Sequence, residues 1–393
     1  MIGSSISWAR KFNPKILFLT LINLVGGKNG EGYFHALYKT WDIESNTIKM
    51  PVKSALTKKR ARISYTFFED IILKSIDSYE PHRRTWRGLR VYATDGDQYE
   101  LPRAKDILSQ GYTGYPCANN TETHYPHMYV VHCYDVLGGV TKAFRFSNKN
   151  EEMALAMEIA TDLESNSLTI YDRLFFCKDL VRAHQLSGSF FLARIKEGGL
   201  VMPQILDFVN SNKRNFTFEF EGTLINLIKV VNPKTGNTTL FATNLSRDRF
   251  KNKEISELYA LRWEVETANR DMSHTLKVEQ WHSHSLNGVL QELYTSLWLM
   301  NNARIQMAAN YRKKCTLGNL FEYSKSNFKL IVDFILNSLK DLARGKLRKI
   351  YQQLKFLLKI TSESRLRRSR SYLRVIKKSR KVYPSASTIP REK

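Results

Sequence analysis

Residues 90–102 have the sequence RVYATDGDQYELP, and at this stretch the chain changes from helical to strand-like patterning. The run RVYAT has the β-branched and aromatic residues typical of a strand. Asp95 follows it directly, Gly96 lets the backbone turn or approach a ligand closely, and Asp97 shares a face with Asp95 if the strand continues. An Asp-Gly turn is the ordinary alternative for this pattern. We predict a strand that ends at Asp95 and presents this carboxylate as a candidate metal ligand.

Strand and helix signals alternate after this stretch. Residues 127–136 and 139–146 predict a hairpin. Residues 150–164 predict a helix, and SLTIY at 167–171 predicts a short strand followed by Asp172. Asp172 is a second candidate ligand, and its ordinary alternative is a strand-end aspartate that caps the next helix. Elements in this order predict an α/β fold with helices packed on a mixed sheet.

The patterning along the whole chain predicts several regions. A long helical tract is expected from Glu254 to about Tyr311. The regions are a helical N-terminal domain at 1–85, two parts of the α/β core at 86–187 and 251–315, a β-rich insertion at 188–250 between them, and a helical basic C-terminal region with an arm at 316–393.

The charge of the chain predicts a polyanionic partner. The 393 residues have a formal net charge of +24, and residues 341–393 hold 17 lysines and arginines against three acidic residues. Apolar spacing predicts a packed helix up to about residue 360, whereas residues 364–381 are typical of a mobile basic arm that binds nucleic acid without reading sequence. A second basic run suits either phosphate contact or a solvated helix face, and it consists of Lys58, Lys59, Arg60 and Arg62.

Other protein classes find little support in the sequence. The four cysteines have no paired spacing, which argues against a disulfide framework and a thiolate zinc site and fits a reducing interior. The apolar run at 16–25 is too short to span a bilayer and predicts a buried helix, so we expect a cytoplasmic protein without a membrane partner. Three histidines, His124, His127 and His132, fall partly on a predicted strand and do not have zinc-ligand spacing. No phosphate-binding loop of the GxxxxGK[ST] type is present, which argues against ATP-driven function.

A polar stripe on the helix predicted after residue 254 supplies a third acidic candidate. Tyr259, Arg262 and Glu266 fall within roughly 60° of one another on a helical wheel, and Arg270 and Ser273 continue the stripe. Glu264 points about 200° away from Glu266. The ordinary alternative is a surface helix with Glu266 between two arginines. An acidic trio gathered from distant segments, here Asp95, Asp172 and Glu266, is suited to hold two Mg²⁺ ions for phosphoryl transfer.

Together the three motifs, DG after a strand, DR after a strand and Y-x2-R-x3-E after a β-rich segment, resemble the DDE transposases of bacterial insertion sequences in the group with the Y-R-E-K signature. The resemblance is strongest from about 90 to 310. It implies an RNase H-like core interrupted by the β-rich insertion, with Asp95, Asp172 and Glu266 as the ligands of two Mg²⁺ or Mn²⁺ ions. It also implies that Tyr259 and Arg262 grip DNA beside the cleaved strand, a hairpin intermediate, a homodimer in the synaptic complex and a bacterial, nucleoid-associated protein.

The chain departs from the family pattern at two positions. The family lysine seven residues after the glutamate is Ser273, and the glycine usual after DR is Leu174. Arg270 and Lys277, on the same predicted stripe, are candidates to supply the missing charge to DNA.

The leading hypothesis is therefore a Mg²⁺-dependent DNA transposase that cleaves element ends and transfers the freed strand to target DNA. Two alternatives stay open. One is a DNA-binding relative that no longer catalyses, a possibility raised by Ser273. The other is a structural basic protein of RNA assemblies, which explains the charge but leaves the acidic trio unexplained.

Overall fold

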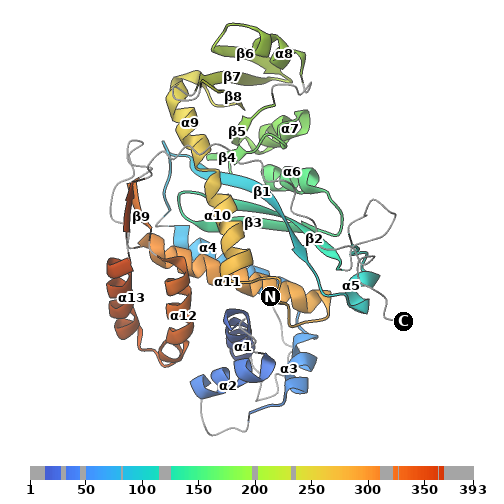
Figure 1. Cartoon of the computed structure of the whole chain (residues 1–393), viewed down its shortest axis with the longest axis vertical. Helices are drawn as coiled ribbons and strands as arrows, with labels where there is room; N and C mark the ends of the chain where they lie inside the picture. The colour runs from blue at the N-terminus through green and yellow to red at the C-terminus, as the bar shows by residue number, and fades with distance from the viewer. Residues whose placement is uncertain are drawn as a thin grey trace, which may run out of the picture.

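The computed structural model describes residues 14–27, 32–44, 50–80, 83–114, 125–196, 202–231, 236–309, 322–325, 327–361 and 363–366. Its centre is one mixed sheet of eight strands with helices on both faces, so the predicted α/β class is confirmed (Figure 1). The strand order is β3-β2-β1-β4-β5-β8-β7-β6. The strands are β1 (Arg90–Glu100), β2 (His127–Asp135), β3 (Val140–Ser147), β4 (Ser167–Tyr171), β5 (Phe190–Arg194), β6 (Asn215–Phe220), β7 (Thr223–Val231) and β8 (Thr238–Thr243).

Strand β1 lies inside the sheet, antiparallel to β2 and parallel to β4. Its side chains alternate between two hydrophobic cores, with Val91, Ala93 and Tyr99 in one and Tyr92 in the other. The first core lies under α4 (Thr66–Tyr79), α10 (Trp263–Arg270) and α11 (Leu286–Ala309), and the second under α6 (Glu152–Thr161) and α7 (Lys178–Ser187). Both faces of the strand are therefore covered, and this explains its nearly continuous burial through residue 94.

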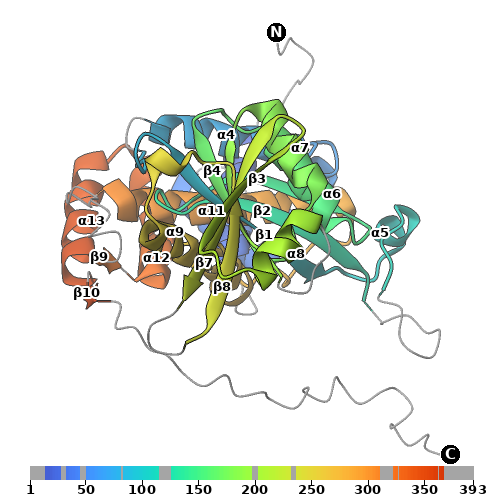
Figure 2. The same cartoon turned by 90° about the horizontal axis from the view of Figure 1, so that it is seen from above.

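Helix α11 joins the sheet to the N-terminal and C-terminal helices. It contacts α4 and β3 on the sheet side, and α1 (Pro14–Gly26) and α12 (Phe328–Ala343) on the other. Figure 1 shows α1, α2 (Tyr33–Glu44) and α3 (Lys53–Arg60) on the side of α11 away from the sheet, and Figure 2 shows α12 and α13 (Leu347–Thr361) together at one end of the molecule. The other elements are α5 (Lys105–Ser109), α8 (Pro203–Asn210), α9 (Asn252–Ala260), two short turns η2 (Arg247–Arg249) and η3 (Asp271–Thr275), and a strand pair, β9 (Glu322–Lys325) with β10 (Glu363–Leu366).

Several sequence predictions are confirmed. The hairpin is β2–β3, the helix predicted at 150–164 is α6, and SLTIY is β4. The N-terminal segment is helical where it is described, and the packed helix predicted before residue 360 is α13, with Ile350, Leu354 and Leu358 buried. Of the predicted basic arm, residues 364–366 belong to β10, and residues 367–381 lie outside the described part of the chain.

Three elements differ from the local pattern. Strand β1 does not end at Asp95 but continues to Glu100, because β2 pairs with it along its length. The segment 188–250 is rich in strands, as predicted, but β5 pairs with β4, and β8, β7 and β6 extend the same sheet. The long helical tract is divided, since α9, α10 and η3 end before a loop that leads to α11.

Among the described residues, every helix is too short or too polar to cross a bilayer.

Candidate active site

Two of the predicted acidic residues are neighbours because of the register between β1 and β4. Thr94 of β1 pairs with Tyr171 of β4, the last pair of this parallel ladder. Asp95 and Asp172 each follow directly after that pair, so they are neighbours. Asp95 shares a face of β1 with Val91 and Ala93, which contact the core under α10. The pair therefore lies at the point where β4 ends and β1 continues.

Asp172 is held by the turn that ends β4. Its Oδ1 accepts a hydrogen bond of 2.6 Å from the Leu174 backbone N–H. The capping alternative does not apply, because the next helix, α7, begins only at Lys178. Leu174, at the position of the family glycine, has an exposed side chain.

Glu266 reaches the site from α10, which is fastened to the sheet by apolar and polar contacts. Val265 and Ala268 are buried against the sheet. Asn269, the residue after Ala268, bonds His132 of β2, with 2.8 Å between Asn269 Oδ1 and His132 Nδ1. The other ring nitrogen of His132, Nε2, is 2.9 Å from Thr141 Oγ1. Burial lowers the pKa of His132 to about 4. Because His132 pairs with Asp95 across β1 and β2, this contact fixes α10 directly over the acidic pair.

Arg262 lies between two of the three carboxylates. Its Nη2 donates to Glu266 Oε1, and its Nη1 is 3.8 Å from Asp95 Oδ1. Its side chain is only 11% exposed. Tyr259 packs on Phe241 of β8 with ring centroids 5.0 Å apart, and its hydroxyl interacts with Arg262. The stripe predicted from spacing is therefore formed, although the helix breaks between α9 and α10 within it.

The neighbouring carboxylates change the chemistry of Asp95. Burial, together with the charges of Glu266, Asp172 and Glu152, raises the pKa of Asp95 to about 7 against the lowering effect of Arg262. The three carboxylates therefore share one partly buried, charged environment, which favours a cation. The oxygen donors suit Mg²⁺ or Mn²⁺.

The three carboxylates do not yet form a finished metal site. In the described residues, no three His, Cys, Asp or Glu side chains have a geometry ready to bind one ion. The position of Arg262 gives a physical reason, because its guanidinium already pairs with Asp95 and Glu266. The donor set fits a divalent cation, and the guanidinium lies where it would compete with such a cation for Asp95 and Glu266.

The other acidic candidates lie elsewhere. Asp97 shares the face of Asp95, as predicted for a continuing strand, but its carboxylate accepts the Gln98 backbone N–H at 2.9 Å and interacts with Glu279. Glu264 is buried on the side of α10 away from Glu266.

The end of the predicted stripe differs from the prediction. Residues 271–275 form a π-helical turn. Such a turn adds one residue to the helix, so the side chains after it point in other directions than a regular helix would give. Ser273 lies within this turn. Arg270 is exposed at the end of α10, whereas Lys277 lies beyond the helix with a positive φ of 48°, so the prediction that it shares the stripe is wrong.

Sequence analysis missed three residues around the trio. Glu152, the first residue of α6, interacts with both aspartates. Arg194, at the end of β5, interacts with Tyr259. Trp263 is 58% exposed beside Arg262, whose Cζ is 5.6 Å from the ring centroid. Nothing in a local pattern distinguishes these residues, because their places near the trio depend on how distant segments pack together.

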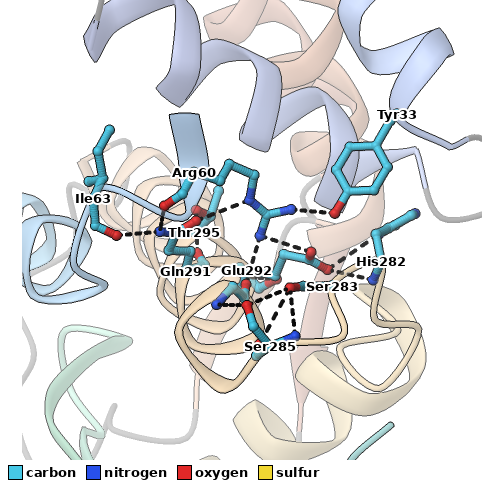
Figure 3. A network of polar contacts seen from close by, with 11 residues as sticks. Tyr33, Arg60, Ile63, His282, Ser283, Ser285, Gln291, Glu292 and Thr295 are labelled. Carbon is cyan, nitrogen blue, oxygen red and sulfur yellow. Dashed lines mark hydrogen bonds and ion pairs between the residues drawn. The ribbon is translucent and has the colours of Figure 1, made fainter. Parts of the chain in front are cut away.

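The basic run of the N-terminal region divides into exposed and buried residues. Lys58 and Arg62 are exposed, and Lys59 is half-buried. Arg60 is 4% exposed and forms the internal network shown in Figure 3. Its Nη2 lies 3.0 Å from Glu292 Oε1 of α11, and its Nη1 donates to Tyr33 Oη at 2.6 Å. It also donates to the Gly288 carbonyl and to Gln291. Arg60 therefore holds α3 on α11 and is not available to contact DNA.

An α/β sheet with an acidic cluster beside a buried arginine, in a strongly basic chain, suits enzymes that act on nucleic-acid phosphates. The profile of the family described as Transposase DDE domain matches residues 86–302, which is more than half of the chain. The chain therefore belongs to the DDE transposase family, and the family resemblance predicted from the motifs is confirmed.

Individual relatives are more distant. The chain is 22% identical over 355 residues to Transposase InsG for insertion sequence element IS4 of Escherichia coli (strain K12), covering 85% of this chain and 78% of InsG. It is 28% identical over 137 residues to the Putative transposase InsZ of the same organism, covering 33% of this chain and only 44% of InsZ. A solved structure of the piggyBac transposase synaptic complex with hairpin DNA aligns over 90% of this chain and 79% of its own, with 12% identity and a TM-score of 0.46.

Proposed function

We propose that this DDE transposase cleaves DNA strands at the ends of an insertion sequence and joins the freed 3′-hydroxyl to target DNA, in a cut-and-paste reaction. The observation that carries the proposal is the meeting of Asp95, Asp172 and Glu266, which come from positions far apart in the sequence and share one charged environment.

The scaffold of the reaction would be an RNase H-like core made of β1–β5 and the helices that cover them. The order β3-β2-β1-β4-β5, with β1 antiparallel to β2 and parallel to β4, supports this assignment. The strands β6–β8 would be the family's β-rich insertion, here continuous with the core sheet.

Asp95, Asp172 and Glu266 would hold two Mg²⁺ or Mn²⁺ ions. Such ions activate the attacking oxygen and stabilise the leaving oxygen of a phosphodiester. The protein's own part is to bring the three carboxylates together, and the fixed register of β1 with β4 and the docking of α10 through Asn269 provide the rigidity for this.

Arg262 would alternate between the carboxylates and the DNA. While it pairs with Asp95 and Glu266 it neutralises them. A phosphate of the cleaved strand offers the guanidinium a bidentate partner. Binding of DNA would then draw Arg262, with Tyr259 beside it, away from the carboxylates and leave these free for metal.

Arg262→Gln tests this exchange, because it should change metal binding and cleavage in opposite directions. Without DNA, the variant should bind Mn²⁺ more tightly than the native protein in isothermal titration, since no guanidinium competes for Asp95 and Glu266. Strand cleavage should fall by roughly 100-fold, the usual cost of removing a preorganised charge next to the reacting group. Arg262→Lys, which keeps the charge, is the matched control, and equal or weaker Mn²⁺ binding by Arg262→Gln would refute the exchange.

DNA outside the active site would bind exposed and half-buried cations on several elements, and a homodimer would hold two element ends. The proposed DNA-binding residues are Lys58, Lys59, Arg62, Arg270 and Lys277. Replacing any one of these cations with a neutral residue should lower the salt dependence of DNA binding by about one unit of slope.

A Mg²⁺-dependent nicking assay on the element's own terminal repeats tests the proposed function. We expect the native protein to nick these ends and Asp172→Ala to bind them without nicking. A native protein that shifts the DNA and never cuts it would instead support the inactive DNA-binding relative, which the loss of the family lysine at Ser273 motivates. Tighter binding to RNA than to DNA at equal salt would favour the RNA-assembly alternative.

A further inference from the structure

In the described part of the chain, no strand pairs with the β4-side edge of β1 beyond Thr94. The Val136 N–H donates to Val91 O, and the Leu101 N–H donates to Pro126 O, so the odd-numbered residues of β1 bond β2. The even-numbered amides point to the other edge, where pairing with β4 ends at Thr94 and Tyr171. Gly96 is the first even-numbered residue of β1 beyond the last pair with β4, so its N–H has no β4 residue opposite it. A buried strand edge needs a partner for such a group.

Glu152 supplies that partner. Its carboxylate accepts a hydrogen bond from the Gly96 backbone N–H. It lies so close to the strand that a Cβ built on Gly96 would be 2.2 Å from Glu152 Cδ and Oε1. The carboxylate therefore lies over the α6-side face of β1 at Gly96, and the absence of a side chain at residue 96 makes room for it.

We propose that Glu152 is a positioning residue of the active site: by holding the Gly96 backbone it fixes the direction in which Asp95 presents its carboxylate next to Asp172. This inference rests on the proposed function, since it assumes that Asp95 and Asp172 bind the catalytic metal. Glu152 acts through Gly96 and is not itself a ligand.

The placement of Glu152 suits this role. It begins α6, where the helix N-terminus favours a negative charge and the packing of α6 on β2 and β3 limits its movement. Asp95 lies on a strand whose pairing with β4 ends one residue earlier, at Thr94, among the described residues. The hydrogen bond at Gly96 therefore holds the backbone next to Asp95 on the β4 side, in addition to the pairing with β2 on the other edge.

Four variants separate the hydrogen bond from the charge. Glu152→Ala removes both, and Glu152→Gln keeps an oxygen acceptor while removing the charge. Gly96→Ala pushes the carboxylate out of its place, and the fold tolerates this because the displaced group is the far end of a flexible side chain. The double variant Gly96→Ala/Glu152→Ala leaves room for the new methyl group. Glu158→Ala, on the exposed face of the same helix, is the control.

The first readout is the apparent affinity for Mn²⁺ without DNA. It is measured as the Mn²⁺ concentration at which the unfolding temperature has risen by half of its maximal metal-induced increase. For Glu152→Ala and Gly96→Ala we expect this concentration to increase about tenfold, as is usual when a group that orients a metal ligand is removed. Glu152→Gln should stay within about threefold of the native protein, because its amide oxygen accepts the same N–H. The double variant should match Glu152→Ala, because the two changes remove one shared interaction. The second readout, DNA affinity, should not change.

Three results would overturn the inference: Glu152→Gln as impaired as Glu152→Ala, additive effects in the double variant, or Glu152→Ala indistinguishable from Glu158→Ala. Asp172→Ala separates this failure from failure of the proposed function. If the native protein responds to Mn²⁺ and nicks DNA, Asp172→Ala does neither, and Glu152→Ala behaves as native, only the inference fails. If the native protein neither responds to Mn²⁺ nor nicks, the proposed function fails.

Discussion

Asp95→Asn should abolish strand cleavage and, at the same time, make the metal-free protein more stable at about pH 8. The cleavage is abolished because an amide is a poor ligand for Mg²⁺ and cannot replace the carboxylate charge. The stability is gained because the native carboxylate is partly buried beside Glu266, Asp172 and Glu152, and its pKa is raised from 3.8 to about 7. Active sites commonly lower the stability of the fold in this way.

The pH dependence of this gain has a definite sign. A folded-state pKa above the unfolded value means that the folded protein binds the proton more tightly, so stability is highest below about pH 4 and is lost as the pH rises through about 7. The difference between the two pKa values corresponds to at most about 4 kcal/mol. Asp95→Asn should therefore equal the native protein in stability near pH 4 and exceed it increasingly up to pH 7, with a constant difference above.

Chemical denaturation of the metal-free proteins at several pH values measures this effect. Glu219→Gln, an exposed carboxylate on β6, is the matched control and should leave the curve unchanged. Added Mn²⁺ should stabilise the native protein at pH 8 but not Asp95→Asn. A variant that is less stable than the native protein at pH 8 would show that the Asp95 carboxylate supports the fold rather than straining it.

Arg60→Met should cost about 3–5 kcal/mol of unfolding free energy, the usual penalty for breaking one side of a buried ion pair. Glu292 has a fully buried side chain, so without Arg60 the close polar partners left to its charge among the described residues are the His282 backbone N–H and ring. The change also removes bonds to Tyr33 and Gln291, which link α2 and α3 to α11 (Figure 3). The midpoint of chemical denaturation measures the destabilisation.

Lys58→Met, two residues earlier on α3, is the matched control for Arg60→Met. Lys58 is exposed, so its replacement should change stability by no more than about 0.5 kcal/mol while reducing the salt dependence of DNA binding. Arg60→Met/Glu292→Leu should recover part of the stability, because the buried charge is then absent. Equal stability of Arg60→Met and Lys58→Met would contradict an internal role for Arg60.

Local patterns predicted the elements whose residues repeat regularly. The alternation in β2 and β3 and the apolar spacing of α6 gave the hairpin and the helix, and the apolar run before Asp172 gave β4. Asp95, Asp172 and Glu266 could be picked out as candidates from the sequence because each follows or belongs to such an element. The resemblance to a family then selected these three among several acidic residues.

The features that failed depend on contacts between distant residues. The Asp-Gly pair at 95–96 suggested that the strand ends, but pairing with β2 carries β1 through it, and Gly96 serves a close approach by Glu152. Arg60 looked like part of a solvated run because its partner Glu292 is 232 residues away. A helical wheel could not foresee the π-turn at 271–275, which turns Lys277 away from the stripe.

The most direct test of the shared metal pocket is the anomalous scattering of Mn²⁺ in crystals of the protein bound to its terminal-repeat DNA. We predict Mn²⁺ peaks within ligand distance, about 2.1 Å, of carboxylate oxygens from all of Asp95, Asp172 and Glu266, with Arg262 turned to a DNA phosphate. Mn²⁺ bound only elsewhere, or one of the three carboxylates still out of reach with the DNA in place, would contradict the account.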